Sequence, residues 1–250
     1  MATAHPHDDT HHRSGHTHDH EHTHDHGSEE QLAAWRDTDP SLWFTESFWD
    51  DRYRERSMWS GNANQRLVEV ATDLAPGRAL DVGCGEGGDA IWLARQGWRV
   101  TATDVSPVAL ERAREAARAA GVGDAITFEH SDGRSDWAPP AAAYDLVTVS
   151  FVQFPRAELA AFHRKLAAAV ARGGTLLITA HHADSHGGGE TPFSAELFAT
   201  AAEMAAGLDL GADWQVSATD PTREAVFPPG PGGRPMTVRD AVLRAVRAPV

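Results

Sequence analysis

Two hydrophobic periods alternate between residues 76 and 182, and they predict alternating strands and helices. Short apolar runs rich in β-branched residues are typical of buried strands, whereas apolar residues at every third or fourth position are typical of helices. Strands are expected in RALDV, WRVTATDV, AITFEHSD, YDLVTVSFV and TLLITAH, which begin at residues 78, 98, 125, 144 and 175. Helices are expected in DAIWLARQG, SPVALERAREAARAAG and RAELAAFHRKLAAAVARGG, which begin at residues 89, 106 and 156. Strict alternation of this kind predicts a parallel sheet covered on both faces.

Residues that begin and end helices support these assignments. Ser106 and Pro107 fit the N-cap and first position of a helix that Gly121 follows, and Gly97 closes the helix before it. Asn62 or Asn64 fits the N-cap of an earlier helix that runs to about Leu74.

The C-terminal part predicts a helix over residues 194–208 and a strand over 214–220. The last segment, TVRDAVLRAVR (237–247), has a helical period, but its valines and its position suit a closing strand. The predicted fold is therefore α/β: a Rossmann-like, seven-stranded, mostly parallel sheet with helices on both faces.

The chain ahead of the sheet divides into two parts. Residues 29–75 carry aromatic side chains at helical spacing and predict an N-terminal helical cap. Residues 1–28 hold almost no apolar side chains and are expected to be a disordered, His-rich tail. We therefore expect one domain over 29–250, in which 29–75 form the helical cap and 76–250 form the α/β core.

The tail contains many potential metal ligands, but their spacing does not match that of a structural metal site. Alternating imidazoles bind divalent metals, and the interleaved acids favour cations, but the spacing fits no zinc finger. A weak, non-structural metal site is expected here, the alternative being a solvated tail. Its ligands would be His16, His18, His20, His22, His24 and His26.

The composition limits which substrates and partners are expected for the protein. The formal net charge is −14, which disfavours nucleic acid as a substrate. The single cysteine, Cys84, excludes an internal disulfide, and no apolar run approaches the length of a membrane span. We expect a cytoplasmic monomer or homodimer that acts on a small molecule and does not bind membranes.

The turn after the first strand, VGCGEGGDA, has two interpretations. Its glycines fit both a dinucleotide-binding loop and a loop that binds S-adenosylmethionine (SAM), and Asp104 lies where either fold has a ribose-binding acid. Asp81, Glu86 and Asp89 surround the turn. Clustered carboxylates repel a pyrophosphate but suit a ligand that carries an ammonium and a sulfonium, so the acids favour SAM.

The segment LDVGCGEGGDAIWLARQGWRVTATDVSPVALERA resembles the first half of a class I SAM-dependent methyltransferase. FWDDRYRERSMWSGNANQRLVEVA, ahead of it, resembles the small-molecule branch that includes tellurite-resistance and thiopurine methyltransferase-like proteins. The resemblance covers about residues 48–178 and implies methyl transfer from SAM to a sulfur, selenium, tellurium or oxygen nucleophile. It is specific for the cofactor and carries little information on the acceptor.

The resemblance also implies roles for individual residues. Asp81 would orient the loop toward the amino group of SAM, and Asp104 would accept both ribose hydroxyls. Ser150 would lie under the methionine part. The other implied contacts are Gly83, Gly85 and Gly87 with the methionine part, Val105, Asp132 and Gly133 with adenine, and Tyr53, Trp59 and Asn64 from the cap. Two alternatives stay open: Asp132 as a plain turn residue, and Tyr53 and Trp59 as ordinary core.

The sequence contains fewer motifs for catalytic residues than for cofactor-binding residues. SFVQFP, after the fourth strand, lacks the Pro-Pro box of many amino-group methyltransferases. His181, His182 and His186 follow the fifth strand, where ligands bind in such sheets, and His181 or His182 is a candidate general base. The alternative function is a metal-responsive protein in which the His-rich tail is the active element and the domain only binds SAM.

Overall fold

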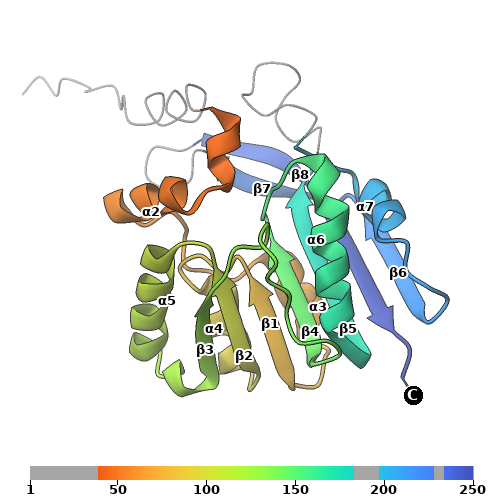
Figure 1. The fold of residues 1–250 in the computed structure, drawn as a ribbon. Helices are drawn as coiled ribbons and strands as arrows, with labels where there is room; N and C mark the ends of the chain where they lie inside the picture. The colour runs from red at the N-terminus through yellow and green to blue at the C-terminus, as the bar shows by residue number, and fades with distance from the viewer. Residues whose placement is uncertain (1–38, 183–196, 228–233, 250) are drawn as a thin grey trace, which may run out of the picture.

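The computed structural model describes residues 39–182, 197–227 and 234–249, which form a twisted sheet with helices on both faces (Figure 1). The strands are β1 (Arg78–Val82), β2 (Arg99–Asp104), β3 (Ile126–His130), β4 (Tyr144–Ser150), β5 (Val170–His181), β6 (Trp214–Thr219), β7 (Thr222–Phe227) and β8 (Arg234–Arg247). The helices are η1 (Pro40–Phe44), α2 (Glu46–Glu55), α3 (Gln65–Ala71), α4 (Gly88–Arg95), α5 (Pro107–Ala119), η2 (Gly123–Ala125), α6 (Arg156–Ala169) and α7 (Ala201–Leu208).

The sheet confirms the predicted Rossmann-like α/β class. Its strand order is β3-β2-β1-β4-β5-β8-β6, and β7 pairs with β8 beside this path. Strands β1 to β5 are parallel, and β8 is antiparallel to β5, β6 and β7. The order reverses between β1 and β4, and such a switch point is where open α/β sheets bind ligands.

Local sequence explains where the central helices begin. The Ser106 hydroxyl accepts a hydrogen bond from the N–H of Ala109, and Pro107 opens α5, as predicted. The Asn64 side chain accepts from the N–H of Arg66 and caps α3. Thr200 and Glu203 form a reciprocal capping box at the start of α7.

Three boundaries differ from the sequence prediction. The helix expected over 156–174 ends at Ala169, and the strand β5 begins at Val170, because a register shift in its pairing with β4 accommodates the extra residues before Thr175. The sheet has eight strands instead of seven, since the pattern did not predict β7. The helix expected over 194–208 begins at Ala201, at the Thr200 cap.

The ambiguous last segment is the long strand β8. It pairs with β5 over seven residues and places Ala241, Leu243 and Ala245 in the core. Strand pairing on both edges therefore decides against the helical period of the segment.

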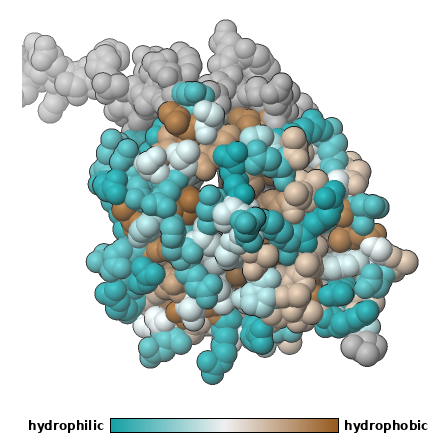
Figure 2. All heavy atoms as spheres, in the orientation of Figure 1, coloured by the Kyte–Doolittle hydropathy of each residue, from teal (hydrophilic) through white to brown (hydrophobic). Residues whose placement is uncertain are grey.

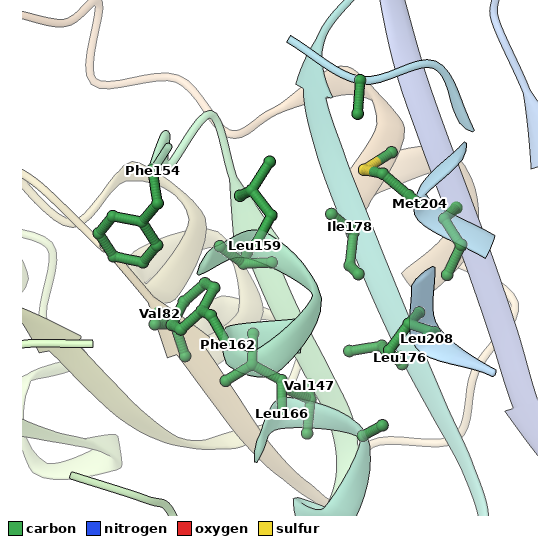
Figure 3. Close-up of a cluster of buried hydrophobic side chains, with 14 of the residues drawn as sticks. Val82, Val147, Phe154, Leu159, Phe162, Leu166, Leu176, Ile178, Met204 and Leu208 are labelled. Carbon is green, nitrogen blue, oxygen red and sulfur yellow. The ribbon is translucent and has the colours of Figure 1, made fainter. Parts of the chain in front are cut away.

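Two hydrophobic layers hold the sheet, one on each face. Leu67, Leu93 and Leu110, from α3, α4 and α5, are buried against one face. The other face carries α6 and α7, and Figure 3 shows their side chains over the strands. Each fully buried leucine contributes about 1.5–3 kcal/mol. The labelled members of this second layer are Val82, Val147, Phe154, Leu159, Phe162, Leu166, Leu176, Ile178, Met204 and Leu208.

The helix α2 lies across the carboxyl edge of the sheet, above the first turn of α5 (Figure 1). The carboxylate of Asp50 accepts a 2.6 Å hydrogen bond from the Ser106 hydroxyl and a 3.4 Å bond from the N–H of Val108. An acid at a helix N-terminus is favoured by the helix dipole. A polar contact thus fixes the cap to the core beside the glycine loop.

The outer surface is mixed in polarity. On the face drawn in Figure 2, hydrophilic and hydrophobic residues are interspersed. Within residues 39–182, 197–227 and 234–249, no helix is both long enough and apolar enough to cross a membrane.

A buried histidine on α6 makes the stability of the fold depend on pH. Burial lowers the pKa of His163 to about 4. As the pH falls below about 6.5, the unfolded chain binds a proton at this side chain, while the native chain does so only near pH 4. The native state therefore loses stability across this window, by up to roughly 3 kcal/mol at its lower end.

We expect His163→Leu to remove this part of the acid sensitivity. Urea unfolding at several pH values from 7 to 4.5 should give a smaller loss of unfolding free energy for the variant than for the wild type. Equal slopes for wild type and His163→Leu would show that the native state protonates His163 as readily as the unfolded chain does.

Candidate active site

The glycine loop between β1 and α4 is built around backbone conformations that favour glycine. Gly83, Gly85 and Gly87 have φ angles of +70°, +53° and +87°. Side chains also come close: a Cβ at Gly83 would collide with the Val152 side chain, and one at Gly85 would lie 3.0 Å from the Tyr53 hydroxyl. The loop therefore has both the conformation and the bare backbone that a closely approaching ligand requires.

Asp104, at the end of β2, fixes the loop. Its Oδ2 accepts a 2.8 Å hydrogen bond from the N–H of Gly85, and its Oδ1 accepts a 2.9 Å bond from the N–H of Ser106. Burial raises the pKa of Asp104, and these backbone donors oppose the rise. Each carboxylate oxygen has a further lone pair, so the same group can accept from two ribose hydroxyls.

Two more carboxylates lie beside the loop, Asp81, which is buried, and Asp89, which is partly buried. Asp81 is 1% exposed, and its Oδ2 has no hydrogen-bond partner among the described residues. Burial, with the nearby charges of Asp89 and Asp104, raises the pKa of Asp81 well above its ordinary value. An unpaired buried carboxylate beside two others attracts a cationic group, so the ammonium of SAM fits the site chemically.

Asp89 connects the loop to two other elements. Its Oδ1 accepts a 2.6 Å hydrogen bond from the N–H of Asn64, and its Oδ2 accepts a 3.0 Å bond from the Ser150 hydroxyl. Burial raises the pKa of Asp89, and both bonds oppose the rise. Ser150 and the start of α3 therefore both lie at the loop.

The side chain of Glu86 faces the cap. Its Oε2 accepts hydrogen bonds from the Ser57 hydroxyl at 3.0 Å, the N–H of Met58 at 2.9 Å and the N–H of Trp59 at 3.1 Å. Its Oε1 pairs with Arg112 at 2.9 Å. The sequence suggested that Glu86 adds negative charge around the ligand, whereas in the structure its charge serves to hold the cap.

We call residues 57–64 the cap segment, and it is fastened along the loop at several points. Glu86 holds its beginning, the Asn62 carbonyl lies 2.8 Å from where a Cβ of Gly88 would be, and Asp89 holds its end. The Trp59 indole donates a 2.9 Å hydrogen bond to the Tyr53 hydroxyl, and both groups lie over Gly85. Tyr53, Trp59 and Asn64 are thus brought together at the loop.

The residues expected around adenine lie at the end of β2 and after β3. Val105 is half-buried, and its carbonyl is 3.0 Å from His130 Nε2. Asp132 is exposed and accepts a 2.8 Å bond from the N–H of Arg134, so its carboxylate currently closes a turn. Gly133 packs closely against the Phe162 ring.

The two candidate bases have different surroundings. The His181 ring stacks on Phe151, directly after Ser150, with 4.5 Å between ring centroids. His182 is 5% exposed, and its Nε2 lies 3.9 Å from Asp220 Oδ2. His181 is therefore the candidate nearer the end of β4. His186 and the tail histidines lie outside the described residues, and within those residues no group of three potential ligands could hold a metal ion.

Several residues of the site were not predicted. Asp50 and Glu86 act through partners roughly 26 to 58 positions away in the chain. Their acidic character was visible in the sequence, but their partners depend on how the cap docks. Cys84, the single cysteine, is buried in the loop, and burial raises the pKa of its thiol well above the ordinary value.

The topology, the glycine loop and Asp104 define the class of SAM-binding Rossmann-like domains. Residues 79–174 match a family described as a methyltransferase domain. The 27-O-demethylrifamycin SV methyltransferase of Amycolatopsis mediterranei is 33% identical over 101 residues, which are 40% of this chain and 37% of that relative. Other matched relatives methylate tRNA, ribosomal RNA and a release factor, so the family spans several acceptor classes.

Solved structures agree over more of the chain. One, from a study of the conversion of a disulfide bond into a thioacetal group during echinomycin biosynthesis, has a TM-score of 0.64 and 26% identity. It covers 82% of this chain and 92% of its own. TehB from Haemophilus influenzae has a TM-score of 0.61 and 18% identity, over 80% of this chain and 67% of TehB, and shares the fold. Residues 79–174 thus match a methyltransferase domain, and the fold of the chain is similar to that of these solved structures.

The uncompensated charge at Asp81 predicts a conflict between stability and ligand binding. Asn keeps an acceptor for the N–H of Ala90 but removes the buried charge. We expect Asp81→Asn to raise the Tm of the ligand-free protein by a few degrees, at about 2–4 °C per kcal/mol. We also expect it to shrink the Tm increase that S-adenosylhomocysteine (SAH) produces.

Thermal unfolding with and without SAH measures both effects. Asp73→Asn, at an exposed position at the end of α3, is the control and should change neither value. A lower Tm for ligand-free Asp81→Asn would contradict the inference that this carboxylate destabilises the native state.

The bonds from Glu86 predict that the cap opens more readily when its charge is removed. Hydrogen bonds to a charged group each contribute about 1.5–3 kcal/mol. Glu86→Gln should therefore raise the rate of tryptic cleavage after Arg56, which directly precedes the cap segment, roughly tenfold. Mass spectrometry of timed digests locates the cut.

Glu111→Gln is the matched control, because Glu111 pairs with Arg114 and Arg118 on the outer face of α5. It should leave the cleavage rate after Arg56 unchanged. Unchanged cleavage in Glu86→Gln as well would show that other contacts hold the cap segment.

Proposed function

We propose that this protein transfers a methyl group from SAM to a small-molecule acceptor through a sulfur, selenium, tellurium or oxygen nucleophile. The observation that carries the proposal is the set of three carboxylates around the bare backbone of the glycine loop: Asp81 and Asp104, which are buried, and Asp89, which is partly buried. Burial raises the pKa values of Asp81 and Asp89, and the amino group of SAM would supply a cation that stabilises their charged forms.

The residues of the loop have distinct roles in this proposal. Asp104 binds the ribose hydroxyls while it keeps Gly85 in place, and Asp81 and Asp89 attract the ammonium. Ser150, tied to Asp89, supports the methionine part. Val105, Asp132 and Gly133 line the adenine side, for which the side chain of Asp132 turns from the N–H of Arg134 toward the base.

SAM supplies an activated methyl group on its sulfonium, so the protein needs mainly to align the acceptor and exclude water. Alignment of two reactants is worth up to roughly 7–11 kcal/mol in favourable cases. Tyr53 and Trp59 exclude water from above Gly85, and Asn64 holds the cap segment against Asp89. Since these side chains lie over the loop, we infer that the cap segment moves when the cofactor enters.

A small acceptor is supported by the surroundings of the site. The cap covers the loop, and the chain carries a net charge of −14, which repels a phosphodiester backbone. His181, at the end of β5 and stacked on Phe151, is the better placed of the two histidines to accept a proton from a hydroxyl or thiol acceptor. His182 serves instead as a buried neighbour of Asp220.

The proposal predicts that SAH binding depends on Asp104. Calorimetric titration of the wild type should give a dissociation constant on the order of micromolar, with no binding of NAD⁺. Asp104→Asn should weaken SAH about ten- to a hundredfold, since charge-assisted hydrogen bonds to both ribose hydroxyls are lost.

Asp124→Asn, an exposed acid of the turn before β3, is the control and should bind SAH like the wild type. Circular dichroism verifies that each variant is folded. Wild-type affinity in Asp104→Asn, or preferential binding of NAD⁺, would sink the proposed function.

A further inference from the structure

The chain takes a strained conformation where β4 ends. Phe151 has a φ angle of +58°, which is rare for a bulky side chain, and its N–H donates a 2.7 Å hydrogen bond to the carbonyl of Thr179. Strain of this kind persists where the surroundings hold a residue in place, and it concentrates at functional sites. Here it directs the aromatic ring of Phe151 onto His181, beside the proposed cofactor site.

An arginine of the last hairpin reaches the same ring. The guanidinium carbon of Arg223, on β7, lies 5.3 Å from the centroid of Phe151. Its Nε donates to both carboxylate oxygens of Asp240, at 3.1 and 2.9 Å. Among the described residues, Arg223 donates hydrogen bonds only from Nε. The N–H groups of its two terminal nitrogens can therefore bind a further acceptor.

A second arginine shares the buried carboxylate. Asp240 is 0% exposed, and Arg66 Nε, from α3, lies 3.7 Å from its Oδ2. Arg66 also pairs with Glu69, which is half-exposed on the same helix. Thus Asp240 is the buried counter-charge of two arginines, and Glu69 additionally compensates Arg66, the less exposed of the two. The side chain of Arg223 is 23% exposed, and its positive charge faces the end of β4.

We propose that Arg223 binds a carboxylate of the methyl acceptor, and that the acceptor lies against Phe151 and His181. The inference rests on the proposed function. Ser150 is hydrogen-bonded to Asp89 at the proposed methionine site, and the next residue, Phe151, contacts Arg223. The arginine and the proposed methionine site therefore adjoin consecutive residues of the chain. A guanidinium presents parallel N–H groups that match a carboxylate, and Asp240 keeps this fork oriented.

The arrangement also gives the acceptor a defined orientation. Its anionic group would be held by Arg223, which leaves its nucleophilic atom free to face the cofactor near Ser150. His181, whose ring stacks on Phe151, would be close to that nucleophile. The substrate class is therefore a small organic acid that carries a thiol, selenol or hydroxyl.

The test titrates the SAH complex with benzoate, with benzyl alcohol as the uncharged comparison and inorganic phosphate as an alternative anion. Benzoate should bind, benzyl alcohol should bind at least tenfold more weakly, and Arg223→Lys should weaken benzoate about tenfold. Arg244→Lys, at an exposed position on β8, is the matched control and should bind benzoate like the wild type.

A second variant separates recognition from folding. Arg223→Gln combined with Asp240→Asn removes both partners of this ion pair, while Glu69 still compensates Arg66, and the variant should remain folded and bind SAH while losing benzoate. The proposal is overturned if benzoate does not bind, if both Arg223 variants bind it normally, or if phosphate or benzyl alcohol binds more tightly. Failure of SAH to bind the wild type would refute the proposed function, whereas SAH binding without benzoate binding would refute the role of Arg223 alone.

Discussion

The hydrogen bond between Asp104 and the N–H of Gly85 fixes the geometry on which the rest of the site depends. It joins the end of β2 to the loop that leaves β1, across the neighbouring pair of parallel strands. The other oxygen of Asp104 accepts from Ser106, which caps α5. One carboxylate therefore sets the loop and the start of the next helix relative to each other. A shift of Asp104 would displace both at once.

The cap takes its position from the same arrangement. The Ser106 hydroxyl donates to Asp50 of α2 while it caps α5, so α2 docks on a helix start that Asp104 has already placed. Glu86 then holds the cap segment from within the loop. The docking of the cap thus depends on the hydrogen bonds of Asp104. The two sides of the proposed cofactor site therefore cannot be positioned independently.

Much of the fold and of the candidate site could be predicted from the sequence, because the signals for it are local. Strand hydrophobicity, the spacing of the glycines, and the Ser106–Pro107 helix start are local signals, and they predicted the parallel strands, the loop and α5, but not β7. Glu86 and Arg223 carried no such signal, because their roles depend on partners brought together by folding. The strand β8 was ambiguous for the same reason: pairing with β5, β6 and β7 determined its conformation.

The distribution of charge explains why the two halves of the proposed reaction site differ. Around the loop, buried carboxylates lack a cation, and around Phe151 an arginine has hydrogen-bond donors to spare. The two regions adjoin consecutive residues: Ser150 contacts Asp89 of the loop, and Phe151 contacts Arg223. A cationic donor on one side and an anionic acceptor on the other would each neutralise a charge that the fold leaves exposed to the site. Burial strengthens both attractions, because the interior screens charges less than water does. The same polarity would draw donor and acceptor together across the end of β4, where methyl transfer requires them to meet.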